Sequence, residues 1–404
     1  FLEIPTNLGK QSARPSLKLG EGPADATVDS RRGILLWPTS EVHPPGDYRF
    51  TVTASVGNRN AEQTFLVRVS KAPLMPGSER TDFSVHETPT GQDNPFETTE
   101  ELKPKGKIDE FVFAKLKELK IEPSNPCSDG AFLRRVYLDT LGTLPTAEEA
   151  RRFLEDSTPD KRAKLIDELL ERPEFADYLA MKWSDLLRVK AEFPINLWPN
   201  ASQAYHHWIR ASIREDMPYD RFVRELLTAC GSNFRTPQVN FYRALQSKDP
   251  SAIASAVALA FMGVRTDSWP KERLDGMAVF FSQVGYKPTG EWKEEIIVWD
   301  PRKTKKEPDA PPVEPVFPDG TPAKLPPDKD PREVFADWLI DAKNPWFTRH
   351  IVNRIGYWLL GRGIVHEPDD IRPGNPPQNL ELLNWLADEL VRAKYDLKHI
   401  YRAI

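Results

Sequence analysis

Four polar side chains fall on one predicted helix near the end of the chain, within residues 345–360. They are Arg349, His350, Asn353 and Arg354, and they form two pairs, Arg349 with Asn353 and His350 with Arg354. Side chains four residues apart lie on the same side of an α-helix. The pattern therefore predicts a polar stripe that brings two arginines and a histidine close together.

A polar loop follows this helix, and it contains Asp369, Asp370 and Arg372. If the loop folds back, its carboxylates come beside the arginines and His350. Such a group could act as a general acid and a general base, as in glycoside hydrolysis. The same charges could instead form a salt-bridged clasp that holds the loop to the helix. We favour the clasp, because structural ion-pair networks are common and the sequence shows no perturbed pKa.

A second candidate is the polar interruption at residues 266–273, which separates an alanine-rich apolar stretch from the apolar residues that resume at Met277. It contains Trp269, one of eleven tryptophans in the chain. A flat exposed tryptophan can stack on a sugar ring, whereas most tryptophans in helical domains fill the core. We expect an exposed connector here, with Trp269 placed to contact a ligand or a partner protein.

Other potential ligand residues are weaker candidates. His206 and His207 are adjacent on a predicted helix, so their side chains point about 100° apart and cannot easily bind one metal ion. We interpret them as a surface histidine beside a packing histidine, and we predict no metal site. Cys127 and Cys230 could form one disulfide or remain as buried thiols. We favour buried thiols, because free cysteine is among the most buried residue types.

The N-terminal part of the chain is predicted to be β-structure. Residues 48–56 alternate between apolar and polar side chains, as in a strand with one buried face. A turn at residues 57–60 and a partner strand with Phe65 and Val67 complete a predicted hairpin. Residues 20–70 also resemble the immunoglobulin-like, cadherin-like modules of bacterial surface and exported proteins, which implies a β-sandwich over residues 1–72.

After an extended linker over residues 73–106, the apolar spacing becomes helical. Thr146 and Glu149 form a predicted capping box, and Pro173 marks another helix start. We predict an α-helical domain over residues 107–299. The proline density of residues 300–330 excludes a helix, so this segment is predicted to be a connector.

A last α-helical domain is predicted over residues 331–404, beginning at Asp330-Pro331. Its helices are expected near residues 332–342, 345–360 and 379–394. The fold class is therefore multidomain: an N-terminal immunoglobulin-like β-sandwich followed by mainly α-helical domains. We expect the C-terminal domain to be truncated, since the chain ends inside a helical pattern.

Composition excludes several classes of protein. The chain has 404 residues, 39% hydrophobic and 28% charged, with 38 prolines, which indicates globular domains joined by rigid connectors. The net charge of -5 and the absence of a basic stripe make nucleic acid a poor candidate partner. The longest apolar run is shorter than the roughly 18 residues that span a membrane. The sequence opens on Phe1 with no initiator methionine and no signal peptide, as expected of a mature or trimmed product.

Two long regions carry a family resemblance. The fragments FLRRVYLDTLGTLPTAEEARRFLED and MPYDRFVRELLTA resemble the planctomycete cytochrome-associated domain of unknown function. The fragment ADWLIDAKNPWFTRHIVNRIGYWLLGRGIVHEPDD resembles the companion domain that follows it in those proteins. Members are exported multidomain proteins, often with a cytochrome c module or immunoglobulin-like modules, and are suspected to act in polysaccharide use. The resemblance implies the same setting for this chain.

The haem motif of that family is missing. In the family, the helix that corresponds to residues 252–265 is commonly followed by Cys-x-x-Cys-His, which holds haem. Here residues 266–277 contain neither cysteine nor histidine. A non-covalent haem would need ligands such as Met262 or Met277, which we interpret as core residues. We therefore predict no haem and no other cofactor.

These observations leave three functional hypotheses. We favour an exported, non-catalytic interaction or assembly protein that belongs to a larger extracellular or periplasmic complex with other protein subunits. The first alternative is a polysaccharide-binding or polysaccharide-processing protein that uses Asp369, Asp370 and His350 for chemistry, and Arg349, Asn353, Arg354, Arg372 and Trp269 for binding. The second alternative is a relative of redox proteins that has lost its haem site.

Overall fold

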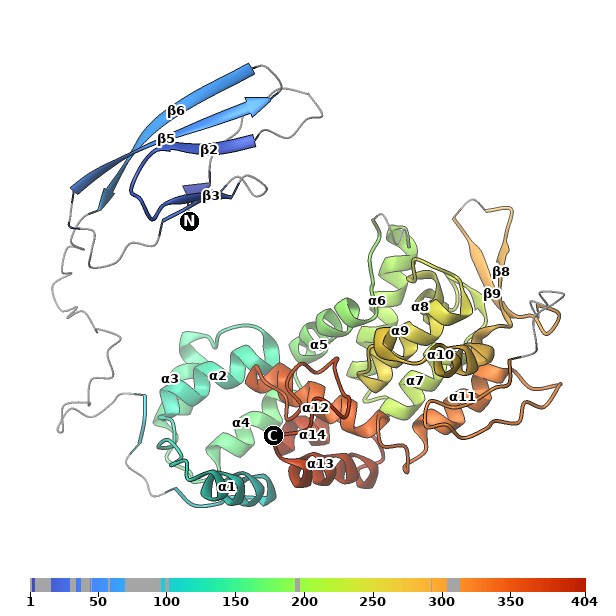
Figure 1. The fold of residues 1–404 in the computed structure, drawn as a ribbon. Coiled ribbons are helices and arrows are strands. Elements are labelled where there is room, and N and C mark those ends of the chain that lie inside the picture. Colours follow the sequence, from blue (N-terminus) through green and yellow to red (C-terminus); the bar gives the residue numbers. More distant parts are fainter. Residues whose placement is uncertain are drawn as a thin grey trace. The chain divides into compact units, whose positions relative to one another are not determined.

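The structure is a computed structural model. It describes residues 2–3, 16–29, 34–37, 44, 46–56, 59–69, 96–98, 102–192, 197–291, 293–303 and 313–404. Most of the predicted linker and residues 304–312 of the predicted connector lie outside these ranges. The chain divides into two compact units, Phe1–Gln92 and Asp93–Ile404, which are drawn in Figure 1.

The N-terminal unit contains two small antiparallel sheets. One has the order β1 (Leu2–Glu3), β4 (Ile34–Leu36), β3 (Thr27–Asp29), and the other has the order β2 (Ser16–Glu21), β5 (Gly46–Val56), β6 (Arg59–Val69). β5 and β6 pair from Gly46↔Val69 to Val56↔Arg59, so the predicted hairpin is confirmed. The small buried core of the N-terminal unit consists of Leu17, Ala26, Phe50 and Val52.

The second unit is mostly helical, in agreement with the mainly α-helical prediction. Its helices are α1 (Lys107–Leu119), α2 (Asp129–Leu141), α3 (Ala147–Glu155), α4 (Lys161–Leu170), α5 (Pro173–Leu186), α6 (Pro199–Arg214), α7 (Tyr219–Thr228), α8 (Asn240–Arg243), α9 (Pro250–Met262), α10 (Lys271–Ala278), α11 (Pro331–Ile340), α12 (Phe347–Leu360), α13 (Leu380–Arg392) and α14 (Leu397–Ala403). Short 3-10 turns occur as η1 (Pro237–Val239), η2 (Thr266–Ser268) and η3 (Val279–Phe281).

Local sequence signals explain where several helices begin. Thr146 Oγ1 accepts from Glu149 N at 3.2 Å and Glu149 Oε2 accepts from Thr146 N at 2.7 Å, which confirms the capping box of α3. Proline occupies the first turn of α5, α9 and α11, where a missing N–H is tolerated. Asp330 caps α11 by accepting from Arg332 N.

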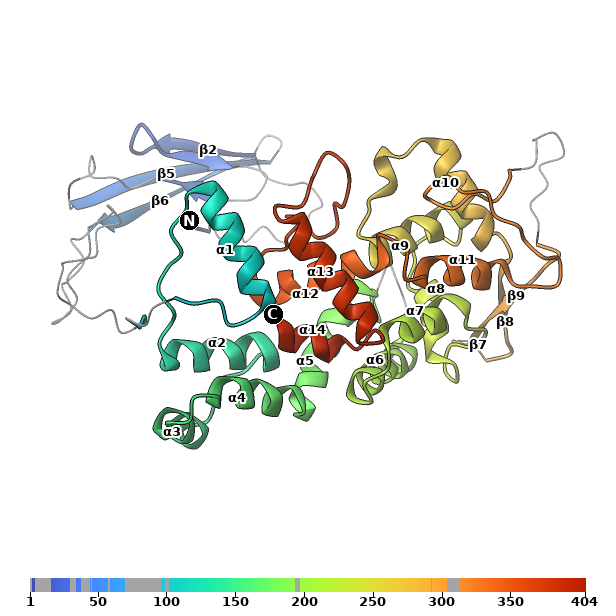
Figure 2. The same cartoon turned by 90° about the horizontal axis from the view of Figure 1, so that it is seen from below.

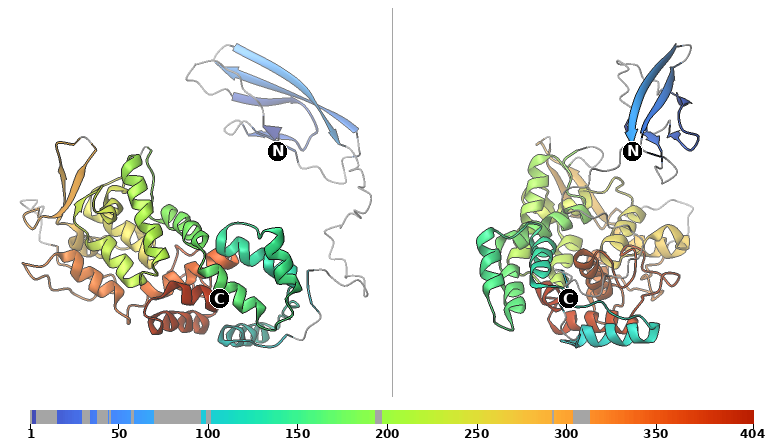
Figure 3. Two further views of the ribbon diagram at one scale, coloured as in Figure 1. Left: turned by 180° about the vertical axis from the view of Figure 1, so that it is seen from behind. Right: turned by 90° about the vertical axis from the view of Figure 1, so that its left-hand side faces the viewer.

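A small sheet in the helical unit was not predicted. β7 (Gly231–Ser232), β9 (Glu295–Trp299) and β8 (Val284–Pro288) form an antiparallel sheet in that order, and the β8–β9 hairpin is the orange element in Figure 3. The run Ile296-Ile297-Val298 carries the β-branched signal of a strand. Residues 107–299 are therefore helical with an added sheet.

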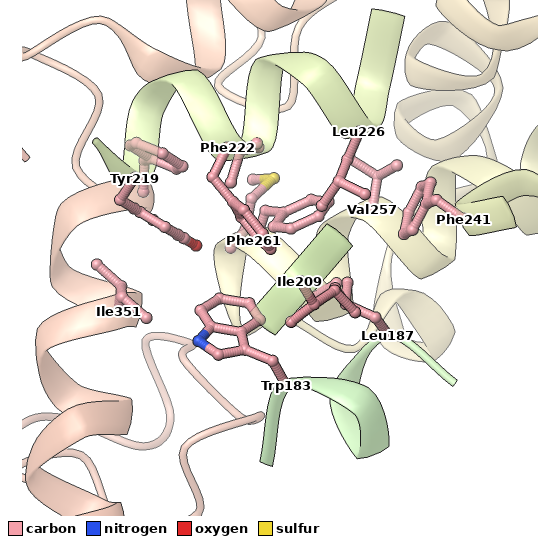
Figure 4. Close-up of a cluster of buried hydrophobic side chains, with 14 of the residues drawn as sticks. Trp183, Leu187, Ile209, Tyr219, Phe222, Leu226, Phe241, Val257, Phe261 and Ile351 are labelled. Atoms are coloured by element: carbon pink, nitrogen blue, oxygen red, sulfur yellow. The ribbon is translucent and has the colours of Figure 1, made fainter. Parts of the chain in front are cut away.

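One continuous hydrophobic core runs through the second unit, from Leu133 on α2 to Tyr401 on α14. Figure 4 shows part of it, where Trp183, Tyr219 and Phe261 converge with Ile351. Within the predicted connector, Phe317 is also a core residue, because its ring stacks on Phe280 and on Trp338 at centroid distances of 5.0 Å.

The prediction of buried thiols is wrong. Cys127 and Cys230 are both free and both exposed. Cys127 lies in the extended segment before α2, where its backbone forms an isolated β-bridge with Glu97. Cys230 follows the last turn of α7. Although Cys230 is exposed, its Sγ accepts a hydrogen bond from the buried Arg332 Nη2 at 3.0 Å. Among the described residues, no helix combines the length and the apolar character that crossing a membrane requires.

Candidate functional site

The predicted polar stripe on α12 is mostly buried. His350 and Asn353 have no exposed surface, and Arg354 is 6% exposed. Arg349 is partly exposed and forms no ion pair or side-chain hydrogen bond with any described residue. α12 therefore turns three of its four candidate side chains toward the interior of the unit.

Asn353 fastens the beginning of the following loop to α12. Its Nδ2 donates to the Val365 carbonyl oxygen at 3.1 Å, and its Oδ1 accepts from Val365 N at 2.8 Å. Gly363 packs against the same amide, since a Cβ at that position would lie 2.7 Å from Asn353 Oδ1. Because the amide is occupied by the main chain, Asn353 positions the loop.

Arg354 joins α12 to one of the predicted carboxylates. Its Nη2 donates to Asp369 Oδ1, and its Nε donates to His350 Nε2 at 3.1 Å. The Arg354 side chain is almost fully buried, while the Asp369 side chain is about one-third exposed. A charge-assisted hydrogen bond of this kind holds the loop against the helix.

His350 is buried beneath this ion pair as a neutral imidazole. Burial and the positive charge of Arg354 hold the pKa of His350 well below its usual value, and only the Phe261 backbone carbonyl acts in the opposite direction. Because Nε2 accepts from Arg354, the ring proton belongs on Nδ1. Nδ1 is buried and has no partner with normal hydrogen-bond geometry among the described residues.

This burial predicts a loss of stability in acid. Since the pKa of His350 is depressed in the folded state, the unfolded chain binds a proton below about pH 6.5 that the folded chain does not bind. The free energy of unfolding should fall by about 1.4 kcal/mol per pH unit from this residue. Denaturant titrations should show that His350→Gln removes this slope. The exposed His207 is the control, and an unchanged slope in His350→Gln with a reduced slope in His207→Gln would contradict the prediction.

The second predicted carboxylate, Asp370, forms an ion pair within the loop itself. Arg372 Nε donates to Asp370 Oδ1 at 2.8 Å and to Oδ2 at 3.0 Å. Asn375 Nδ2 donates to the carbonyl oxygens of His366, at 2.7 Å, and of Asp370, at 3.0 Å. The loop is thus closed by its own polar groups.

The loop also contacts the end of α9, just before the interruption, and Figure 2 shows the two segments next to each other. Ile371 N donates to the Gly263 carbonyl oxygen at 2.8 Å. Gly263 has a positive φ of 65°, and a Cβ there would lie 2.5 Å from His350 Cδ2 and 2.8 Å from the Pro368 carbonyl oxygen. Only glycine fits this close approach without a shift of its neighbours.

Between the interruption and the loop lies an open groove. It consists of two adjoining hollows of about 360 and 290 Å³ that share Arg265, Ser268, Asp370 and Arg372. The other residues that line the two hollows are Asp267, Glu367, Val264, Trp269, Arg273, Trp346, Ile371 and Pro373. We refer to it below as the groove.

Trp269 lies in this groove as a half-buried side chain, although most residues of the interruption are exposed, as predicted for the connector. Part of it packs on the core, and the Arg273 guanidinium lies 3.9 Å from the centre of its ring. Arg273 is itself held by a bond from its Nε to the Pro318 carbonyl oxygen at 2.8 Å. Thr266 is buried, and its hydroxyl forms a hydrogen bond with the Ser255 hydroxyl. This contact anchors the interruption.

The structure brings together most of the predicted site residues. Asp370, Arg372 and Trp269 line the groove, while His350, Asn353, Arg354 and Asp369 fasten the loop that forms one wall. Residue patterns missed Trp346, Arg265 and Asp267 as groove residues. No local signal marks these three residues as groove residues, because they come together only through tertiary packing.

The predicted catalytic groups are held as structural ties and are poorly placed for acid–base chemistry. Asp369 is paired with Arg354, Asp370 with Arg372, and His350 is enclosed. A general acid or base must reach the proton that it transfers. By contrast, Arg265 and Asp267 are exposed and form no ion pair with any described residue, so they are available to a ligand.

The remaining candidates lie outside the groove. His206 is half-buried and His207 exposed, with ring centres 6.2 Å apart, as a packing and a surface histidine should be. Within the described part of the chain, no group of three or more His, Cys, Asp or Glu residues could hold a metal ion. Met262 and Met277, the conceivable ligands of a non-covalent haem, are fully buried among core side chains.

Two regions of the chain match known protein families. Residues 107–269 match PSCyt2, described as a protein of unknown function (DUF1549). Residues 331–404 match PSD1, described as a protein of unknown function (DUF1553). No curated protein and no solved structure matches the chain.

Proposed function

We propose that this chain, whose residues 107–269 belong to the PSCyt2 family and residues 331–404 to the PSD1 family, is a non-catalytic binding or assembly protein. Both regions contribute to the groove. The observation that carries this proposal is the use of the candidate catalytic groups as structural ties. Asp369 is bonded to Arg354 and Asp370 to Arg372. The groove then serves as the binding surface of the protein.

The proposal includes an exported setting, as part of a larger extracellular or periplasmic complex with other protein subunits. The two N-terminal sheets support it, since we interpret them as an immunoglobulin-like β-sandwich that spaces or adheres. The β5–β6 hairpin and its buried Phe50 fit that interpretation.

A polysaccharide ligand is the second candidate function, and the two tryptophans of the groove favour it. Trp269 and Trp346 provide aromatic faces, while Arg265, Asp267 and Arg372 provide hydrogen-bonding groups for sugar hydroxyls. The two hollows, of about 360 and 290 Å³, are each at the lower end of the size of sites that hold small molecules.

One experiment separates binding from chemistry. The full chain should release no sugar from a panel of polysaccharides, with or without Asp369→Asn. If a glycan binds on an array, Trp269→Ala should weaken that binding by about tenfold, since an aromatic contact contributes about 1.5 kcal/mol at most. The control is Trp385→Ala on α13, because Trp385 packs against Phe111 and does not line the groove.

Turnover that disappears in Asp369→Asn would overturn the non-catalytic proposal. Glycan binding that is equally weakened in both tryptophan variants would remove the groove as the sugar site. Absence of any glycan binding would leave protein partners as the ligands of the groove and would reject the polysaccharide candidate.

A further inference from the structure

The groove is built from two parts of the chain that are far apart in sequence. One wall comes from residues 264–273, and the other from Trp346 and residues 367–373. We call residues 102–303 the first segment, residues 331–404 the second segment, and the surface between them the seam. The groove therefore forms only when the two segments are packed together at the seam.

Aromatic side chains pack directly across the seam. The rings of Tyr219 and Phe347 stack with centroids 4.7 Å apart and an interplanar angle of 11°. Trp183 meets Trp358 edge-on at 5.8 Å. Figure 4 shows Ile351 of α12 facing Trp183 and Tyr219 of the first segment. Separation of the segments would expose this apolar surface to water, which is unfavourable.

Buried polar groups also find their partners across the seam. Arg332 of the second segment is 1% exposed, and its Nη1 donates to the Ala229 carbonyl oxygen at 3.2 Å at the end of α7. Tyr219 N donates to the Tyr395 carbonyl oxygen at 3.0 Å. A buried charge or backbone group that loses its partner is strongly destabilising. Each segment thus completes the hydrogen bonding of the other.

Ion pairs surround this contact. Lys398 pairs with Asp216 at 3.0 Å and with Glu171 at 3.3 Å, and Arg402 pairs with Asp167. Such pairs are individually weak when exposed, but they fix the orientation in which two surfaces meet. The Lys398 side chain is only 12% exposed, while its partners Glu171 and Asp216 are 68% and 47% exposed, so these pairs lie at the edge of the seam.

We infer that the second segment is an obligate partner of the first, although the two match separate families. The segments form one cooperative unit, and the groove forms only when they are docked. A chain that carried either segment without the other would lack both the groove and a completed core. This inference does not depend on what the groove binds.

Hydrogen exchange in the intact full chain tests the inference. Peptides from α7 and from α12 are followed by mass spectrometry over a denaturant series. We expect both helices to lose protection at the same denaturant concentration, because a cooperative unit opens as a whole. Loss of protection in α12 at a clearly lower concentration than in α7, or the reverse, would overturn the inference.

Two variants sharpen the test. Arg332→Leu removes a link across the seam, and it should lower the midpoints of α7 and α12 by the same amount. Arg392→Leu removes an exposed ion pair with Glu389 within α13, and it should leave both midpoints unchanged. A shift of the denaturant midpoint confined to α12 in Arg332→Leu would contradict the inference. If that variant does not fold, the comparison of α7 with α12 in the wild-type chain decides the question.

Discussion

Replacement of Arg332 by leucine lowers the free energy of unfolding by about 3–5 kcal/mol, the range seen when one member of a buried ion pair is removed. Arg332 Nη2 donates to Asp330 Oδ2 at 2.6 Å, and their side chains are 1% and 8% exposed. Without the guanidinium, the Asp330 carboxylate stays buried with no countercharge. The Thr228 and Ala229 carbonyl oxygens lose a donor at the end of α7 as well.

Denaturant unfolding of the full chain measures this loss. Arg392→Leu provides the control, since its exposed ion pair should contribute less than about 1 kcal/mol. A double variant, Arg332→Leu with Asp330→Leu, should be more stable than Arg332→Leu, because it removes the uncompensated charge. A loss below about 1 kcal/mol in Arg332→Leu would mean that water or a shifted carboxylate replaces the guanidinium.

The second large effect is expected at Gly263. Gly263→Ala places a Cβ 2.8 Å from the Pro368 carbonyl oxygen and 2.5 Å from His350 Cδ2, in a backbone conformation with a φ of 65°. The left-handed conformation costs about 1–2 kcal/mol for a residue with a Cβ. The clash adds about 1–3 kcal/mol, as overpacking does. We therefore expect a total loss of about 2–5 kcal/mol in the free energy of unfolding.

Gly361 allows the two contributions to be separated. Its φ is 72°, yet a Cβ there would meet nothing within 4 Å. Gly361→Ala should therefore lose only the conformational part, and its difference from Gly263→Ala measures the clash with His350 of α12 and with Pro368 of the loop. Equal losses in the two variants would show that the loop yields freely and is not held tightly at Gly263.

The positions of many helices were predictable, because their signals are local. Proline and capping residues mark the starts of α3, α5, α9 and α11 within a few residues. The β7–β9–β8 sheet was missed, since β7 has only two residues and its pairing joins parts of the chain far apart in sequence. Burial of Phe317 was missed for a similar reason, because a proline-rich segment gives no periodic signal.

The candidate site was predicted in its residue types but not in its arrangement. Helical spacing identified Arg354 and His350 as neighbours, and the loop supplied Asp369 as predicted. Spacing could not show that this side of α12 faces the core, because burial depends on α9 and on the loop that cover it. Trp346 and Trp269 meet at the groove only through tertiary packing, so no local pattern joins them.

We propose that Asp369 and its neighbours form a structural clasp beside the groove. Sugar release by the full chain and by Asp369→Asn, measured on the same panel of polysaccharides, tests it most directly. We expect no release by either protein, together with a lower free energy of unfolding for Asp369→Asn. Release by the wild-type chain that is lost in a folded Asp369→Asn variant would contradict it.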